Sequence, residues 1–317
     1  MMMKRPTKNS QTEFKTMLYT VASQSYIGGR ARNEDRVSVS SRNDAVLMVL
    51  AGGLGGHDGP DIASQGLIDA MTQSFERTPT ENLADPVAFL QLAIKYAHSV
   101  IRHRAAKNKL PPHVPKTTCV ACLIIDGIAW WAHAGDSRLY LYRDGRMAYR
   151  TEDHSNDSTR DIESDTISRY VGGRSQPDVT IGPKVRLEHN DMILLCSDGA
   201  WRNIESADVM KHIEPELPQN GLNKLLRALE LRNQEPSDNL SAIALCWGVE
   251  YASKNNIREE QMDLLKGAVP EPIITPDNTP TEPEYAENSK SQKQTLESFD
   301  SMIAELENFV DKFEKSR

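Results

Sequence analysis

Three aspartates in the 317-residue chain share one context. Asp136, Asp198 and Asp238 each lie in a short polar turn beside an apolar run. Any one of them alone would be typical of a turn residue. Rigid strands that brought the three together from distant parts of the chain would create a site for Mg²⁺ or Mn²⁺, which prefer oxygen ligands. Glu34 and Asp35, just before another apolar run, would add two more carboxylates.

A cationic side chain, Arg30, lies four residues before this acidic pair. A guanidinium group binds phosphate oxygens in a bidentate manner, so Arg30 could hold an anion beside bound metal. The alternative for this segment is a solvated charged loop. The glycine-rich run at 52–59 contains neither a GK[ST] nor a GxGxxG motif, and the histidines form no HExxH pattern. These absences argue against a Walker site, a dinucleotide site and a zinc hydrolase.

The motifs follow one another in an order that resembles a known family. They read RARNEDR, LAGGLGGHDGPDIAS, KTTCVACL, AHAGDSRLYLYRDG, TEDHS, DMILLCSDGAW and SDNLSAIAL. Over residues 19–247 the chain resembles the bacterial metal-dependent Ser/Thr protein phosphatases, the PPM or protein phosphatase 2C-like family. The resemblance implies hydrolysis of phosphoserine and phosphothreonine in proteins with two to three divalent cations, Mn²⁺ or Mg²⁺. It also implies a phosphoprotein substrate and a function opposing a Ser/Thr kinase.

The resemblance also implies a role for each matched residue. Arg30 would hold the substrate phosphate, and Asp35 would order water at the metal centre. The other matched groups would bind metal: Glu34 and the backbone carbonyl of Gly53 on the second-metal side, Asp198 and Asp238 at the first metal, and Asp136 at a third, looser metal. Residues around 151–180 would form a mobile flap beside the site, which includes Tyr170, Gly172 and Gly173.

One position departs from the family pattern. The family's loop reads Asp-Gly-Met/Leu-Gly-Gly-His, whereas this chain has Gly52 where the aspartate stands. That aspartate is the carboxylate that bridges the two catalytic cations, and glycine offers no side-chain oxygen. A second departure is Lys116, where the family usually has glycine.

Gly52 leaves three hypotheses open. In the first, the chain is an active phosphatase whose aspartate was replaced deliberately, so that catalysis is impaired. In the second, the replacement is natural and the chain is a degenerate, phosphatase-like binding or adaptor module. In the third, the chain is a scaffold that acts mainly through its C-terminal helix.

The elements that must position these residues are mainly strands, which come in runs and do not alternate one by one with helices. The predicted strands are short, β-branched or aromatic and bounded by turn residues; they are 18–23, 36–40, 45–51, 118–125, 128–134, 139–143, 192–196 and 240–246. Asp-Gly pairs at 126–127 and 144–145 predict tight hairpins. Helices are predicted at 62–75, 85–107, 208–212 and 221–231. Runs of strands favour an α+β fold with antiparallel sheets, and the family resemblance implies a four-layer α-β-β-α sandwich.

The chain divides by composition into a leader, a domain and a tail. We predict a flexible leader at 1–15, the phosphatase-like domain at 16–250, a proline-rich acidic linker at 251–290 and an amphipathic helix at 291–317. Apolar residues from Leu296 to Phe313 recur at spacings of three and four, which places them on one helix face. This helix either folds back on its own domain or docks on a partner or a second copy through 296–313.

Overall charge and cysteine content limit the possible partners and the cellular location. The net charge of −8 argues against a nucleic-acid partner, because phosphate binding needs a basic surface. The longest apolar run, 45–51, is too short for membrane insertion. Cys119 and Cys122 form a CxxC on a predicted strand, where they would point to opposite faces as buried thiols. We therefore expect a cytoplasmic protein without a disulfide framework.

Overall fold

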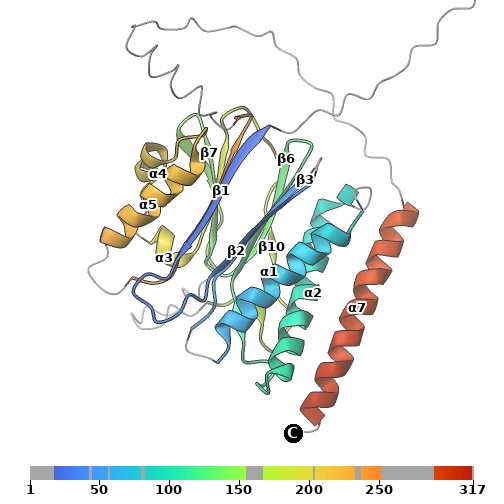
Figure 1. Ribbon diagram of the computed structural model, residues 1–317. Coiled ribbons are helices and arrows are strands. Elements are labelled where there is room, and N and C mark those ends of the chain that lie inside the picture. The colour runs from blue at the N-terminus through green and yellow to red at the C-terminus, as the bar shows by residue number, and fades with distance from the viewer. Residues whose placement is uncertain are drawn as a thin grey trace, which may run out of the picture.

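Two antiparallel β-sheets pack face to face, and helices cover their outer faces (Figure 1). The computed structural model describes residues 18–42, 45–55, 58–79, 83–154, 167–202, 204–232, 237–250 and 289–315. The first sheet runs in the order β1 (Tyr19–Tyr26), β13 (Leu240–Trp247), β12 (Met192–Cys196), β7 (Arg138–Arg143) and β8 (Arg146–Arg150). The second runs β10 (Thr180–Ile181), β6 (Ile128–Ala134), β5 (Cys119–Ile125), β3 (Ala45–Ala51) and β2 (Arg36–Ser41), with β11 (Val185–Arg186) also paired to β6. A small separate sheet joins β4 (Lys116–Thr117) to β9 (Val171–Gly172).

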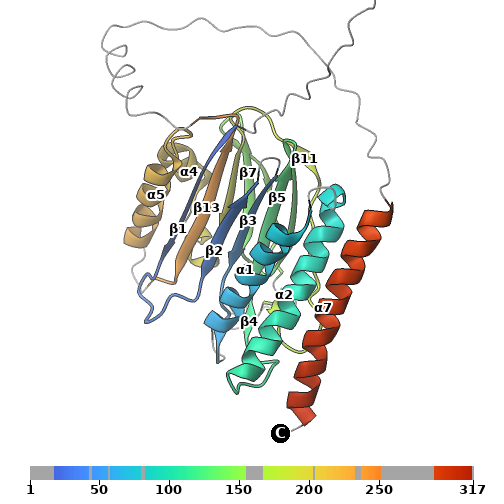
Figure 2. The ribbon, with the colours of Figure 1, turned by 45° about the vertical axis from the view of Figure 1, so that its right-hand side comes forward.

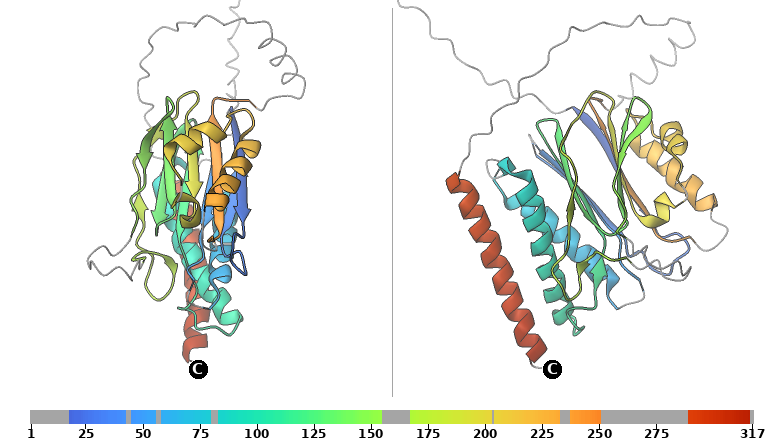
Figure 3. Two further views of the ribbon diagram at one scale, coloured as in Figure 1. Left: turned by 90° about the vertical axis from the view of Figure 1, so that its left-hand side faces the viewer. Right: turned by 180° about the vertical axis from the view of Figure 1, so that it is seen from behind.

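The helices lie on both sides of the paired sheets. α1 (Pro60–Arg77) and α2 (Pro86–Lys107) cover the second sheet, and α4 (Ser206–His212) and α5 (Pro218–Arg232) cover the first. A short helix, α3 (Asp198–Trp201), follows β12 directly. The view from behind shows α7 (Ser289–Lys315), the α1–α2 layer, the two sheets and the α4–α5 layer in that order (Figure 3). The predicted α+β sandwich of four layers is therefore confirmed, and α7 adds a helix outside it.

Alternating side chains divide the core into three parts. On β6, Trp130 packs under the α1–α2 layer, whereas Trp131 points between the two sheets. Cys119 and Cys122 on β5 divide in the same way, because neighbouring strand positions face opposite sides of a sheet. Both thiols are buried and free, and burial raises the pKa of Cys119 to about 12. The CxxC thus serves the core, as predicted.

Local sequence signals placed most strands well. The strands at 45–51, 128–134 and 192–196 have the predicted bounds. Both Asp-Gly pairs form hairpins with positive φ at each central residue, 49° and 73° at Asp126-Gly127 and 50° and 70° at Asp144-Gly145. Type I′ turns require this geometry, and Asp-Gly accommodates it. The prediction missed β8, because its side chains are largely exposed and show no apolar alternation.

The C-terminal helix α7 lies alongside α2 (Figure 2). Phe299 and Val310 on its inner face are buried, and the Phe299 ring meets Tyr96 of α2 edge-on at 6.1 Å between centroids. An ion pair of 3.6 Å joins Arg102 of α2 to Glu314. Of the two alternatives for this helix, the described residues show the one in which it folds back on its own domain. It begins at Ser289, two residues before the predicted start.

Several predictions concern residues outside the described ranges. The leader at 1–15 lies there entirely, and so does the linker apart from its last two residues, since residues 1–17 and 251–288 are not described. Within the described ranges, no helix combines the length and apolar character needed to cross a bilayer.

Candidate active site

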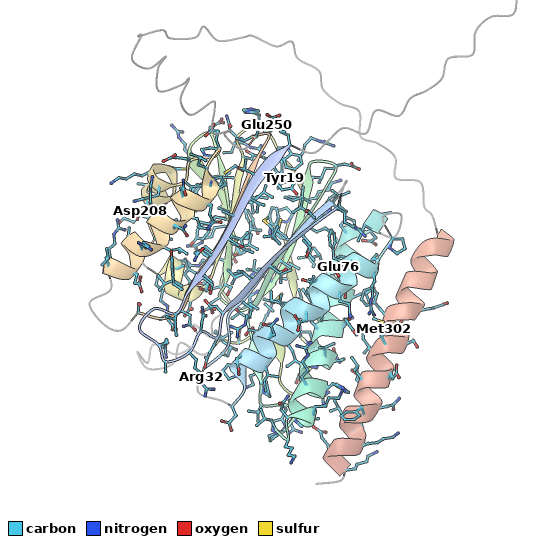
Figure 4. The ribbon with its side chains drawn as sticks, viewed as in Figure 1. Tyr19, Arg32, Glu76, Asp208, Glu250 and Met302 are labelled. Atoms are coloured by element: carbon cyan, nitrogen blue, oxygen red, sulfur yellow. The ribbon has the colours of Figure 1, made fainter. Side chains whose placement is uncertain are left out.

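A cleft of about 360 Å³ opens at one end of the sandwich. Figure 4 places Arg32, one of its lining residues, on the loop at the end opposite Tyr19 and Glu250. The cleft brings together every residue that the sequence assigned to metal or phosphate: Arg30, Glu34, Asp35, Gly52, Gly53, Asp136, Asp198 and Asp238. Strand ends supply most of these groups, so both sheets hold the site rigidly.

The loop that carries Arg30 is fastened to the segment that carries Asp238. The side chain of Asn239 donates to the carbonyls of Ile27 at 2.8 Å and Arg32 at 3.0 Å, and it accepts from the Glu34 N–H at 2.8 Å. The Arg30 guanidinium donates to Asp238 at 2.6 Å. One buried amide thus fixes the loop at three points.

Gly28 allows the close approach of these two segments. Its φ is +60°, and a Cβ there would lie 2.2 Å from the Asp238 carbonyl oxygen. Only glycine fits such a position without displacing backbone.

Gly52 has a different setting, because its backbone does not need glycine. Its φ lies outside the left-handed region. Its N–H donates to the Thr118 hydroxyl at 2.9 Å, and its carbonyl accepts from the Thr118 N–H at 2.8 Å. A Cβ at position 52 would lie 3.0 Å from Thr118 Oγ1, 3.3 Å from Asp35 Oδ1 and 3.6 Å from Ser137 Oγ. A side chain at this position would therefore enter the cleft among polar groups.

The turn around Asp136 is held from three sides. Gly135 N–H donates to His154 Nδ1 at 3.2 Å, and the Ser137 and Thr118 hydroxyls lie 2.7 Å apart. The indole N–H of Trp201 donates to the Asp136 carbonyl at 2.7 Å. These bonds fix the backbone, so the Asp136 carboxylate is presented to the cleft from a rigid turn.

Four carboxyl groups that line the cleft have raised pKa values. Burial raises the pKa of Asp35 to about 7, against the opposing hydrogen bonds from Ser197 and Ser241. Burial, together with the charge of Asp198, raises the pKa of Asp136 to about 7. The pKa values of Glu34 and Asp198 are also raised, chiefly by burial. The acidic side chains of the cleft are therefore poorly stabilised in their charged form, both by water and by the basic side chains nearby.

Two arginines offset part of this charge. Arg30 pairs with Asp238 at 2.6 Å, and Arg202 lies 3.3 Å from Asp198. Asp35 Oδ2 is buried and has no hydrogen-bond partner among the residues that the structure describes. A buried carboxylate oxygen without a partner is costly, and a bound cation would satisfy it.

The donor chemistry fits a divalent cation, although the ligands are not preassembled. Among the described residues, no three Asp, Glu, His or Cys side chains already surround one point. Mg²⁺ does not require this, because it is usually held by one or two carboxylates and completes its shell with water. The unpartnered oxygen of Asp35 and the raised pKa values of its neighbours are the features that a cation would relieve.

The three predicted flap residues lie beside the cleft wall and do not line it. Val171–Gly172 forms β9, and the Gly172 N–H donates to His98 Nδ1 of α2 at 3.2 Å. The Lys116 ammonium lies 4.6 Å from the centre of the Tyr170 ring, and Gly173 N–H donates to the Pro115 carbonyl at 3.2 Å. Residues 155–166 lie outside the described ranges, and Ile167 is the residue of this region that lines the cleft.

Sequence reasoning gave no role to several groups that shape the site. Asn239 and Ser137 each follow a proposed metal ligand directly, and adjacency to a ligand was the available signal. Thr118 lies in the KTT motif, but its contact with Gly52 depends on tertiary structure. Trp201 ends the DMILLCSDGAW motif, but its hydrogen bond to Asp136 depends on tertiary structure.

A two-sheet sandwich with a carboxylate-lined cleft at its end defines the class. The profile of the family described as Protein phosphatase 2C matches residues 24–230, and the chain belongs to that family. The Serine/threonine protein phosphatase PstP of Mycobacterium tuberculosis is 29% identical over 231 residues. That alignment covers 68% of this chain and 42% of the relative's length.

Solved structures agree with this assignment. The Streptococcus agalactiae serine/threonine phosphatase superposes with a TM-score of 0.64, covering 74% of this chain and 100% of that one, and at 20% identity it supports the fold. The catalytic domain of PstP in complex with two manganese ions has a TM-score of 0.58 at 27% identity, covering 73% of this chain and 99% of that one. The family thus uses divalent metal, and its members named here are bacterial Ser/Thr phosphatases.

Proposed function

We propose that this chain acts on phosphoserine and phosphothreonine in proteins with Mn²⁺ or Mg²⁺, and that Gly52 impairs the hydrolysis. The cleft residues and the family membership support the reaction class. The observation that carries the second part is the position of Gly52, which lines the cleft in a backbone conformation open to any residue.

Gly52 supplies no carboxylate at the position where two cations would need a ligand in common. A Cβ there would point between Thr118 Oγ1 and Asp35 Oδ1. Two cations about 3.5–4 Å apart repel each other unless anionic ligands lie between them. Without this carboxylate, the second cation would bind weakly, and Glu34 and the Gly53 carbonyl would have to hold it with water.

The remaining residues have separable roles in this proposal. Bound cations would supply positive charge and a water of lowered pKa. Asp136, Asp198 and Asp238 would hold cations, and Asp35 would orient water through its free oxygen. Arg30 uses one of its five N–H donors on Asp238 and can offer others to phosphate. Charge on the phosphoryl oxygens would thus be stabilised by a positioned guanidinium.

The ion pair between Arg30 and Asp238 favours the alternative in which the chain is a natural binding or adaptor module. A guanidinium bound to a proposed metal ligand at 2.6 Å already neutralises that carboxylate. A chain that relied on this pair would bind phosphoprotein without hydrolysing it, as a natural phosphatase-like binding or adaptor module. Restoring the carboxylate at position 52 separates these two functions.

The test is to compare the native chain with Gly52→Asp on p-nitrophenyl phosphate and on phosphoserine and phosphothreonine peptides with Mn²⁺. We expect the rate of hydrolysis to rise at least about a hundredfold in G52D, because the loss of one group that stabilises charge in an active site typically lowers the rate by about that factor. Asn220→Asp is the control, because it adds one negative charge at an exposed position of α5 that does not line the cleft. A folded G52D that stays inert with Mn²⁺ and Mg²⁺ would refute the phosphatase proposal and favour the binding module.

The proposed setting follows from the same chemistry. A protein phosphoserine is the product of a Ser/Thr kinase, so we propose a phosphoprotein partner made by such a kinase. We propose a cytoplasmic location, which four free, buried cysteines support, because reducing compartments keep thiols unpaired.

A further inference from the structure

Trp201 connects the two segments that carry Asp136 and Asp198. Asp198 is the first residue of the short helix α3, and Trp201 is the last. The indole Nε1–H donates to the Asp136 carbonyl at 2.7 Å, across from α3 to the turn between β6 and β7. The carbonyl that accepts this bond belongs to the same residue whose carboxylate lines the cleft.

The indole ring is itself held in place. The Arg138 guanidinium lies 3.3 Å from the ring centre. Arg138 is fixed in turn by two hydrogen bonds to Asp153, at 2.8 and 2.6 Å. A cation stacked on an aromatic face and tied to a carboxylate keeps the ring from rotating away. The direction of the indole N–H is therefore set before any ligand binds.

We propose that Trp201 is a positioning residue that fixes Asp136 relative to Asp198 and so sets the affinity of the cleft for a divalent cation. This inference rests on the proposed function, in which both aspartates hold cations. His154 and Thr118 anchor the flanking Gly135 and Ser137, but the bond from Trp201 is the one that ties the Asp136 peptide to α3. Groups that orient metal ligands in this way commonly change metal affinity when they are removed.

Trp201→Phe removes the N–H and keeps an aromatic ring over Arg138. The side chain is half-buried, so the substitution leaves no large cavity in the core. The lost hydrogen bond and the freer turn should weaken Mn²⁺ binding about three- to tenfold. Asp136→Asn should weaken it as well. In the double variant W201F/D136N the added effect of W201F should vanish, because Trp201 acts only through Asp136.

The experiment is calorimetric titration of the full chain with Mn²⁺ for the native protein, W201F, D136N and the double variant. Trp247→Phe is the control, since Trp247 stacks on Tyr19 at 6.4 Å and does not line the cleft. Thermal unfolding of each metal-free variant shows whether it is folded. The inference predicts a coupled loss in W201F and none in W247F.

The outcomes separate the two proposals. If D136N weakens Mn²⁺ binding and W201F leaves it unchanged, or if W201F weakens it equally with and without D136N, the role of Trp201 is refuted alone. If the native chain binds no Mn²⁺, or D136N binds it as tightly as the native chain, the metal role of Asp136 fails and the inference fails with it.

Discussion

A replacement of Asn239 should disturb the loop that carries Arg30 while hardly changing the shape of the side chain. Its amide makes three hydrogen bonds to the loop that carries Arg30, and it is 5% exposed. Asn239→Asp keeps the size of the side chain and the acceptor for the Glu34 N–H. It removes both donors, so the carbonyls of Ile27 and Arg32 face a carboxylate oxygen.

The expected loss follows from those two bonds. A buried acceptor left without its donor costs about 1–3 kcal/mol, so the loss of both bonds in N239D should lower the free energy of unfolding by about 2–6 kcal/mol. For a domain of this size the melting temperature should fall by about 2–4 °C per kcal/mol. Acidification should recover part of the loss, because a protonated carboxyl can donate one hydrogen bond again.

Urea unfolding followed by circular dichroism measures this difference at pH 7.5 and at pH 5. Asn220→Asp is the matched control, since Asn220 is exposed near the start of α5 and the same change of charge there should stay within about 0.5 kcal/mol. An N239D protein as stable as N220D would show that the amide does not hold the loop, and the account of the Arg30 loop would be wrong.

Two further predictions concern the helix layer and the buried acid. Phe299→Ala should lower the free energy of unfolding by about 3 kcal/mol, because Phe299 is 4% exposed and packs edge-on against Tyr96; an effect no larger than that of the exposed Asp300→Ala would mean that α7 does not stay on α2 in solution. The pKa of Asp35 is raised to about 7, so the folded protein loses stability as pH rises through 7. Asp35→Asn lacks this loss, and in EDTA its stability relative to the native chain should be higher at pH 8 than at pH 5; urea midpoints at the two pH values that differ by the same amount would contradict it.

The sequence predicted the sandwich because central strands such as β3 and β6 are buried on both faces and are followed by turn residues. Continuous apolar runs such as 45–51 and Asp-Gly pairs fix strands and hairpins locally. β8 and the two-residue strands lacked such signals, since exposed or very short strands depend on their neighbours. The C-terminal helix showed its apolar face in the sequence, but what that face covers is a tertiary property.

The features of the site also divide into those that the sequence predicts and those that it does not. Carboxylates at strand ends could be predicted to converge, because strands of one sandwich end together, and the structure places all of them in one cleft. The ion pair of Arg30 with Asp238 and the bond from Trp201 to Asp136 could not, because each depends on the direction of one side chain, which only tertiary packing sets. Motif order identifies the groups that touch a ligand more readily than the groups that hold them.

The proposed effect of Gly52 on catalysis has a counterpart in the stability of the fold. A carboxylate built on a Cβ that lies 3.3 Å from Asp35 Oδ1 would add repulsion to acids whose pKa values are already raised. Glycine removes that repulsion, so the chain can fold with Arg30 and Arg202 as the cations near Asp238 and Asp198. Restoring the aspartate should therefore make folding more dependent on Mn²⁺, with stabilisation growing as the logarithm of the free metal concentration above its dissociation constant. In this proposal, glycine at position 52 would weaken a two-cation site and would also reduce the need for a cation during folding, so the proposed loss of activity is linked to the charge balance of the cleft.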